Sequence, residues 1–198
     1  EISLSSLNTV FVYKKNYKDF LIINILLNTM GPVIDEEGTK RWYKDGKLHR
    51  EDGPAVEWPN GYRSWYINDK RHRENDPAIE YENGNKEWWM NGKLHREDGP
   101  AIEYSNGDKD WYKDGKRHRE DGPAIEGADG EKWWYKGGKR HREDGPAVEY
   151  AYGRKAWYIN DKKVSETEHK AHFERVRKLQ HKYYYKWVEW HFDPNRKG

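Results

Sequence analysis

Cysteine is absent from the 198-residue chain, and aliphatic residues are scarce. Without cysteine there is neither a disulfide framework nor a zinc site with thiolate ligands, and this usage is typical of a reducing, intracellular compartment. A membrane span needs about 18 consecutive apolar residues, and the nearest candidate, Phe20 to Leu27, is far shorter. Lysines precede this run as in a signal peptide, but the Asn-Thr-Met-Gly-Pro after it is a poor cleavage site. We therefore expect neither a transmembrane segment nor a signal peptide.

No single sign of charge dominates the sequence. Charged residues make up 36% of the chain, hydrophobic residues only 34%, and the net charge is +2. Because the two signs are interspersed, there is no basic stripe of the kind that binds nucleic acid. Eleven Trp and fifteen Tyr are too many for a disordered chain. This composition predicts a thin structure, such as one sheet layer or a solenoid, stabilised by aromatic rings.

An internal repeat of 23 residues dominates the chain. Gly, His and Pro follow the same period as Trp, and such self-similarity is the mark of a repeat architecture. The six repeated tryptophans form a candidate aromatic ladder: Trp42, Trp65, Trp88, Trp111, Trp134 and Trp157.

Each repeat contains two turn signals, exemplified by Asp45-Gly46 and Asn60-Gly61. These dipeptides are strong hairpin signals because both central residues of a type I′ turn need a positive φ. The segments between them are rich in Trp, Tyr, Val and Ile, which favour strands. We therefore predict a mainly β protein, an elongated single-layer antiparallel β-hairpin array of six 23-residue units over residues 33–164, about 55–60 Å long at ~4.8 Å per strand.

The predicted register assigns side chains to two faces of this sheet. If Asn60-Gly61 is a two-residue loop, Val56 lies opposite Trp65 and Trp58 lies opposite Arg63. The face would then combine aromatic rings with basic residues in cation–π contact. The other face would carry a solvated row of acidic side chains: Glu57, Glu80, Glu103, Glu126 and Glu149.

Residues 165–198 are predicted to form an amphipathic helix and tail that cap the array. Ser165 and Glu168 have the spacing of a capping box. We expect the helix to lie on the last hairpin or on the aromatic face; the alternative is a partner-binding helix with outward basic residues Arg175, Arg177, Lys178, Lys182 and Lys186. Its apolar stripe comprises Phe173, Val176, Leu179, Tyr183, Trp187 and Trp190. Residues 1–29 share nothing with the repeat. They form either a cap or, if the natural protein starts at Met30, upstream sequence that was included by a mistaken start assignment.

A His-Arg-Glu triplet occurs in five of the repeats and resembles a chemical site. Catalysis needs a unique constellation in a pocket, and histidines of neighbouring units, ~9.5 Å apart, are too distant to share one metal ion. We therefore expect no enzyme activity, no metal and no cofactor. The triplets form a candidate interaction ladder: His49, Arg50, Glu51, His72, Arg73, Glu74, His95, Arg96, Glu97, His118, Arg119, Glu120, His141, Arg142 and Glu143.

A structural role for these triplets follows from the predicted hairpin. Across the Asp45-Gly46 turn, Trp42 faces His49, so that the imidazole can pack on the indole. Arg and Glu of neighbouring units are expected to pair along the array. Gly53-Pro54 predicts a bulge or bend because proline cannot continue the strand hydrogen bonds, and Asp52 is expected to bond backbone groups in that turn.

The segments Trp42–Ala55 and Trp89–Ala101 resemble the MORN repeat, which also has about 23 residues and a Gly-Lys-x-His core. Their His-Arg-Glu-Asp-Gly-Pro-Ala is similar to the MORN-variant repeat of bacterial, bacteriophage and large-DNA-virus proteins. This resemblance implies a non-enzymatic scaffold that contacts another protein or a larger assembly, in the cytoplasm, a host cytoplasm or a virion. Carbohydrate or cation binding by the aromatic ladder is the alternative, and the oligomeric state stays open.

Overall fold

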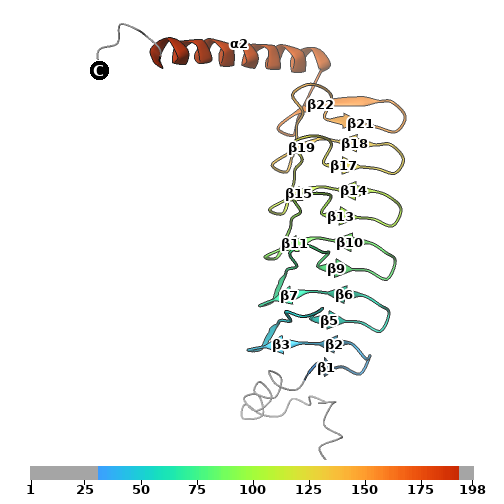
Figure 1. Ribbon diagram of the computed structural model, residues 1–198. Coiled ribbons are helices and arrows are strands. Elements are labelled where there is room, and N and C mark those ends of the chain that lie inside the picture. Colours follow the sequence, from blue (N-terminus) through green and yellow to red (C-terminus); the bar gives the residue numbers. More distant parts are fainter. Residues whose placement is uncertain (1–30, 192–198) are drawn as a thin grey trace, which may run out of the picture.

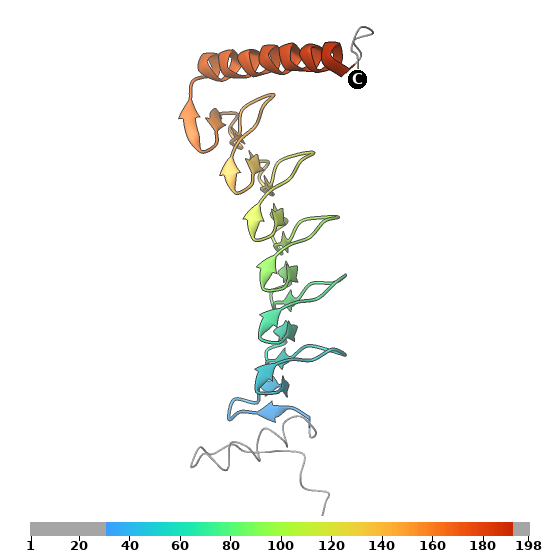
Figure 2. The same ribbon diagram turned by 90° about the vertical axis from the view of Figure 1, so that its left-hand side faces the viewer.

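The computed structural model describes residues 31–191, so the predictions for residues 1–29 and for the end of the tail lie outside it. The described chain is mainly β, with repeated antiparallel hairpins followed by one helix, α2 (Glu166–His191), which confirms the predicted fold class (Figure 1). The repeats stack into an elongated array that does not close into a barrel over the described strands (Figure 2).

One long antiparallel sheet of thirteen strands runs along the array. Each repeat contributes two of its short strands, and neighbouring strands of consecutive repeats pair directly. In spatial order the strands are β1 (Val33–Ile34), β2 (Lys40–Arg41), β5 (Val56–Glu57), β6 (Arg63–Ser64), β9 (Ile79–Glu80), β10 (Lys86–Glu87), β13 (Ile102–Glu103), β14 (Lys109–Asp110), β17 (Ile125–Glu126), β18 (Lys132–Trp133), β21 (Val148–Glu149), β22 (Lys155–Ile159) and β23 (Lys162–Val164).

A row of five small hairpins lies beside this sheet. Asp45 and Gly46 both have positive φ, 52° and 74°, and Lys44 pairs with Lys47, so the predicted two-residue turn is confirmed. The hairpins are β3 (Tyr43–Lys44) with β4 (Lys47–Leu48), β7 (Tyr66–Ile67) with β8 (Lys70–Arg71), β11 (Trp89–Met90) with β12 (Lys93–Leu94), β15 (Tyr112–Lys113) with β16 (Lys116–Arg117), and β19 (Tyr135–Lys136) with β20 (Lys139–Arg140). The paired ends of β22 and β23 form the corresponding hairpin of the sixth repeat.

The second turn of each repeat differs from the prediction by one residue. Val56 pairs with Ser64 rather than with Trp65, because the loop has three residues and not two. The Trp58 N–H donates to the Tyr62 carbonyl at 2.9 Å, and Gly61 has a positive φ of 92°. This is the three-residue hairpin with glycine in the left-handed position.

This shift exchanges side chains between the two faces of the sheet. Because side chains alternate along a strand, a slip of one residue moves each of them to the opposite side. Trp58 therefore lies on the face of Val56 and Ser64, while Trp65 lies on the other. The predicted contact of Arg63 with Trp58 is wrong, since Arg63 pairs with Glu57. The predicted solvated acidic row is also wrong, since the Glu57 side chain is only 31% exposed and lies near Arg50 and Lys40.

The core is thin and consists mostly of small or β-branched side chains. One alanine in each of five repeats is fully buried, and its carbonyl accepts the N–H of the repeated tryptophan, as Ala55 does from Trp42 at 2.9 Å. The buried alanines are Ala55, Ala78, Ala101, Ala124 and Ala147, and Val56, Ile79, Ile102 and Val148 are buried next to them in sequence.

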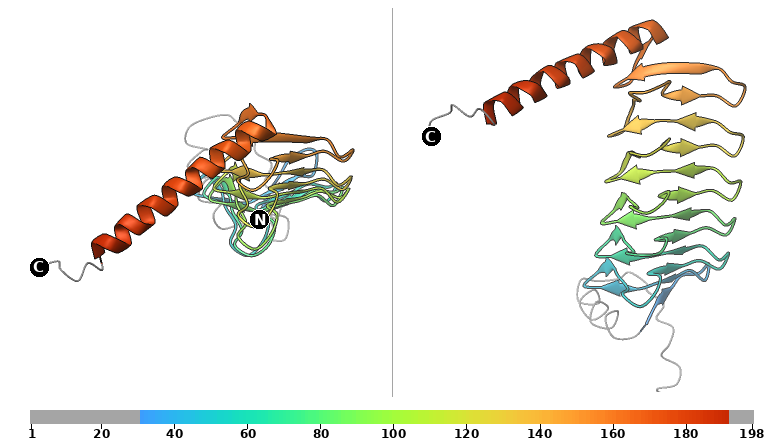
Figure 3. Two further views of the ribbon diagram at one scale, coloured as in Figure 1. Left: turned by 90° about the horizontal axis from the view of Figure 1, so that it is seen from above. Right: turned by 45° about the horizontal axis from the view of Figure 1, so that its top comes forward.

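Helix α2 begins with the predicted capping box and projects away from the array. The Glu168 N–H donates to Ser165 Oγ at 3.2 Å, and the Glu168 carboxylate accepts the Ser165 N–H at 2.8 Å. Only its first turns pack on the array, where His169 and Phe173 are buried. Seen from above, the rest extends beyond the outline of the sheet (Figure 3). The expected cap is therefore present, but only the first turns of the helix lie on the last hairpin. Within residues 31–191 no helix has the length and apolarity needed to cross a membrane.

Candidate functional site

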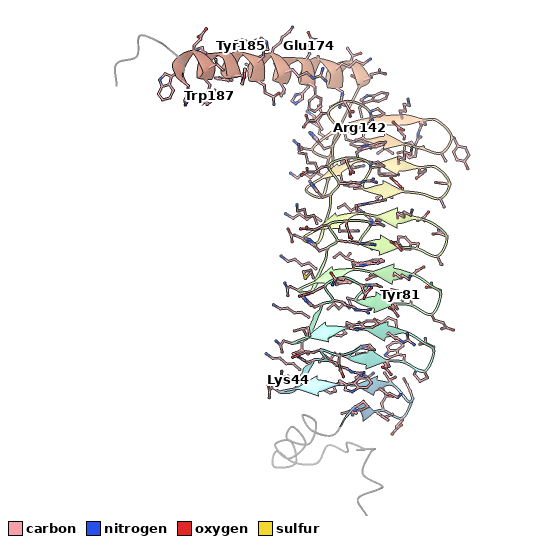
Figure 4. The ribbon with its side chains drawn as sticks, in the orientation of Figure 1. Lys44, Tyr81, Arg142, Glu174, Tyr185 and Trp187 are labelled. Carbon is pink, nitrogen blue, oxygen red and sulfur yellow. The ribbon has the colours of Figure 1, made fainter. Side chains whose placement is uncertain are left out.

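The arginine of each His-Arg-Glu triplet covers the repeated tryptophan of its own unit. The guanidinium carbon of Arg50 lies 4.1 Å from the centre of the Trp42 ring, within the range of a cation–π contact. The same packing recurs at 3.9 to 4.1 Å for Arg73 on Trp65, Arg96 on Trp88, Arg119 on Trp111 and Arg142 on Trp134. We call these five pairs the tryptophan–arginine column; Arg142 marks its end next to the helix in Figure 4.

Each of these arginines is held by groups of its own repeat. Arg50 Nε donates to Asp52 at 2.9 Å, and its Nη1 donates to the Pro54 carbonyl at 3.2 Å and to Glu57 at 3.4 Å. The hydrogen bond from Arg50 lowers the pKa of the Asp52 carboxyl. The predicted pairing of Arg with Glu of neighbouring units is therefore wrong for these arginines. The Asp52 carboxylate binds Arg50 and also its own backbone N–H, so the expected side-chain to backbone bond is present as well.

A glycine makes room for the covering arginine. A Cβ on Gly53 would lie 2.7 Å from the guanidinium carbon of Arg50, so a larger residue requires the arginine side chain to shift. The second repeat has Asp76 at this position, and there Asp76 itself binds Arg73 at 3.1 Å. The variation at Asn75-Asp76 therefore keeps the arginine–carboxylate pair and changes only the residue that supplies the carboxylate.

The histidine of each triplet connects one repeat to the next. His49 Nδ1 accepts the backbone N–H of Asn68, 19 residues later, at 3.3 Å. The other ring nitrogen, Nε2, lies 3.2 Å from the Glu51 carboxylate. The same bond recurs at 3.1 to 3.3 Å from Asn91 to His72, Asp114 to His95, Gly137 to His118 and Asn160 to His141. As predicted, His49 lies opposite Trp42, whose carbonyl accepts the His49 N–H.

The glutamates are the only members of the triplets that point mainly into solvent. The side chains of Glu51, Glu97, Glu120 and Glu143 are 58 to 86% exposed, whereas the arginines of the column are 22 to 28% exposed. The fifth, Glu74, is exposed as well. A partner that binds the candidate interaction ladder would therefore contact mainly a row of glutamate carboxylates.

The tryptophan ladder has little free ring surface. Five of its members are half-buried, and Trp88 is 7% exposed. Arginine covers one ring face of each member except Trp157, whose repeat lacks the arginine. Trp157 instead lies with His169 and Phe173 around a hollow beneath helix α2. A sugar could stack on the covered faces only by displacing the arginines.

The opposite face of the sheet contains an open groove that the predicted register did not reveal. The groove has a volume of about 840 Å³, and the side chain of Trp58 in its wall is 46% exposed. Its rings touch one another, with centres 5.1 Å apart for Trp58 and Tyr62 and 5.4 Å for Tyr62 and Tyr81. We define the tyrosine groove by its lining residues Arg41, Leu48, Val56, Trp58, Asn60, Tyr62, Ser64, Tyr66, Arg71, Tyr81, Glu82 and Asn83.

Polar groups lie among the rings of the tyrosine groove. The Arg71 guanidinium lies 5.0 Å from the Trp89 ring and 5.9 Å from the Tyr66 ring, and within residues 31–191 its buried Nε has no hydrogen-bond acceptor. Glu87 accepts the Tyr81 hydroxyl at 2.9 Å and the Trp89 indole N–H at 2.7 Å. Burial and then Glu87 raise the pKa of Tyr81, so its hydroxyl stays protonated.

A smaller hollow on the same face lies farther along the array, beside Tyr104. There Arg117 donates to the buried Asp110 at 3.1 Å. Desolvation raises the pKa of the Asp110 carboxyl, while the hydrogen bond from Arg117 opposes that shift. The face therefore presents aromatic and arginine side chains in more than one repeat.

The described residues contain no candidate metal centre, and the comparisons with known proteins assign no family. Among residues 31–191 there is no cluster of three or more His, Cys, Asp or Glu side chains able to hold a metal ion. Comparison with protein-family models gave no match, and a search of curated proteins gave none either. The hairpin array is compatible with a MORN-type repeat, and the resemblance to that family stays a prediction.

Proposed function

We propose that the chain is a non-enzymatic repeat scaffold that binds another protein through the tyrosine groove. The observation that carries this proposal is the exposed aromatic wall at Trp58 on a sheet face that has no second layer over the described residues. Trp, Tyr and Arg are the residues enriched in binding hot spots because they bury large areas and keep a polar end for hydrogen bonds.

The chemistry of the groove favours a peptide segment with apolar and hydrogen-bonding groups. Arg71 and the amides of Asn60 and Asn83 provide donors beside the rings of Trp58 and Tyr62. Acceptors on an extended partner chain can bond these donors, while its apolar side chains cover the rings. The triplets support a non-enzymatic role, because their His and Arg side chains are engaged in connecting repeats and in covering tryptophan.

Carbohydrate binding is the second candidate, and one observation favours it. The Trp58 ring is exposed next to two asparagine amides, an arrangement suited to stacking and hydrogen bonding of a sugar. This candidate belongs to the tyrosine groove, since arginines cover the rings of the tryptophan–arginine column.

Affinity capture with matched variants of the chain tests the proposal. The wild type, Trp58→Ala and Tyr152→Ala are compared as baits; Tyr152 is 99% exposed and lies outside the groove. We expect Trp58→Ala to lose a protein that wild type and Tyr152→Ala both retain, and the purified partner to bind Trp58→Ala at least tenfold more weakly. Equal recovery by all three baits contradicts a role for the groove. A glycan-array signal that Trp58→Ala abolishes supports the second candidate instead.

A further inference from the structure

Helix α2 presents an apolar stripe whose larger side chains remain about half exposed. Leu179, Tyr183, Trp187 and Trp190 are 46 to 66% exposed, and Val176 continues the stripe toward the buried Phe173. So many large exposed side chains on one helix face mark an interaction surface. The stretch from Val176 to His191 is about 24 Å long at ~1.5 Å per residue.

The order of residues in this stripe is symmetric about Tyr183. Leu179 and Trp187 are each four residues from Tyr183, and Val176 and Trp190 are each seven residues from it. In an antiparallel pair of identical helices with a two-fold axis at Tyr183, each residue meets its counterpart on the other side of that centre. Val176 would then meet Trp190, and Leu179 would meet Trp187, so that apolar side chains meet apolar side chains throughout.

Charges beside the stripe fit the same arrangement with one exception. Arg175 and Glu189 share one flank of the helix, eight residues before and six residues after Tyr183. Antiparallel pairing therefore brings Arg175 of each copy near Glu189 of the other, with opposite charges. Lys182, on the same flank and next to the centre, meets its own counterpart, and this like-charge contact is unfavourable.

The position of the stripe relative to the array favours a slender occupant. In Figure 4 Trp187 lies on the side of the helix from which the array descends, whereas Tyr185 and Glu174 lie on the opposite side. The stripe therefore faces the inner corner between helix and array. A flat bilayer cannot follow the whole stripe because the array stands in its way, whereas a single helix fits into the corner.

We propose that the chain forms a two-fold symmetric dimer in which the stripes of two α2 helices pack antiparallel, centred on Tyr183. In this arrangement the two arrays leave the helix pair at its opposite ends and run in opposite directions. The dimer does not depend on the tyrosine groove, so either proposal can fail alone.

Sedimentation of the full chain tests dimerisation, with Tyr183→Asp and Tyr185→Asp as a matched pair. Wild type and Tyr185→Asp should sediment at about twice the chain mass of 23.9 kDa, and Tyr183→Asp as a monomer. Circular dichroism checks that all three are folded. Lys182→Gln should lower the Kd for dimerisation by about twofold by removing the like-charge contact. A monomeric wild type at about 100 μM, or equal dissociation of the two Tyr variants, overturns the proposal.

Disulfide cross-linking distinguishes antiparallel from parallel pairing. Because the chain contains no cysteine, each introduced cysteine is the only thiol of its copy. Tyr183→Cys should form a disulfide with its own copy, while Val176→Cys should link only when mixed with Trp190→Cys. Efficient self-linking of Val176→Cys would mean parallel helices and contradict the two-fold arrangement. Cosedimentation with vesicles containing phosphatidylserine tests the bilayer directly: binding of a monomeric wild type that Tyr183→Asp abolishes assigns the stripe to lipid and overturns the dimer.

Discussion

The two faces of the array use the same residue types for different ends. In the tryptophan–arginine column, each guanidinium has a ring on one side and carboxylates and a carbonyl at its edge, so its binding capacity is used within the repeat. In the tyrosine groove Trp58 is 46% exposed, whereas Trp88 of the column is 7% exposed. Aromatic and arginine content alone therefore does not identify a binding face. What distinguishes the two faces is how much of each side chain is already in contact with other groups of the chain.

The strongest way to break this contrast is to remove an arginine from the middle of the column. Arg96→Ala removes the cation–π contact with Trp88 and leaves the half-buried Glu103 without its partner. We expect a loss of about 2–4 kcal/mol in the free energy of unfolding, from the cation–π and charge-assisted hydrogen-bond contributions. Urea denaturation measures it. Arg96→Lys should recover little, since an ammonium lacks the planar fork; full recovery would show that charge alone matters.

Crowding the same arginine should have a smaller effect. In Gly99→Ala the new Cβ would lie 2.9 Å from the guanidinium carbon of Arg96, which must then shift. Because Arg73 keeps its contact with Trp65 beside Asp76, we expect destabilisation of only about 1 kcal/mol, the low end of the range for overpacking. The double change Asn75→Asp with Asp76→Gly converts the second repeat to the common form and should leave the unfolding midpoint nearly unchanged. A larger loss in that double variant than in Gly99→Ala would contradict the role given to the glycine.

Truncating a ring of the groove should affect stability less than truncating the column. Trp58→Ala removes a side chain that is 46% exposed and touches Tyr62 at its edge. We expect about 1 kcal/mol of destabilisation from the partial loss of buried area. Thermal unfolding monitored by circular dichroism gives the value, and a loss as large as that of Arg96→Ala would place Trp58 in the structural core.

Acidification should weaken the joint between the last two repeats. Burial is the main cause that lowers the pKa of His141. A lowered folded-state pKa means that the unfolded chain binds a proton more readily, so this contribution to stability is present at neutral pH and is lost as the pH falls below about 6.5. His141→Asn keeps an acceptor for the Asn160 N–H and should flatten the pH dependence of the unfolding midpoint between pH 7.5 and 5.5. Identical slopes for the variant and wild type would contradict this account.

The smallest effect is expected at the exposed carboxylates of the triplets. The Glu97 side chain is 83% exposed and lies 3.8 Å from His95 Nε2. Glu97→Gln should leave the unfolding midpoint unchanged, because exposed ion pairs contribute little. A clear drop in the midpoint would show that the row of glutamates also holds the array together.

The sequence predicted the units of the array better than its faces. The 23-residue period was sufficient to predict the number of hairpins, and the Asp45-Gly46 signal was sufficient to predict the strand register around that turn. Asn60-Gly61 is the same kind of signal, yet it forms a three-residue loop, and both loop types accept this dipeptide. The difference of one residue decided which face carries Trp58, and that is why the groove was not predicted.

The position of Arg50 over Trp42 and the direction of helix α2 could not be predicted from the spacing of residues in the sequence. Arg50 lies over Trp42 while its Nη1 donates to the Pro54 carbonyl, and turn residues alone do not specify the path of this irregular segment. The spacing of Leu179, Tyr183 and Trp187 predicted an apolar stripe, but it gave no information on where the helix axis points after Phe173. Both outcomes required the relative positions of neighbouring segments in space.

Hydroxyl-radical footprinting of the full chain, read residue by residue by mass spectrometry, tests the contrast between the two faces most directly. Trp58 at 46% exposure and Trp88 at 7% are the reference pair. We predict fast modification of Trp58 and slow modification of Trp88 in the free chain, and protection of Trp58 but not of Trp88 when a partner binds. Equal rates for the two rings in the free chain, or partner protection that falls on the column instead of the groove, would contradict it.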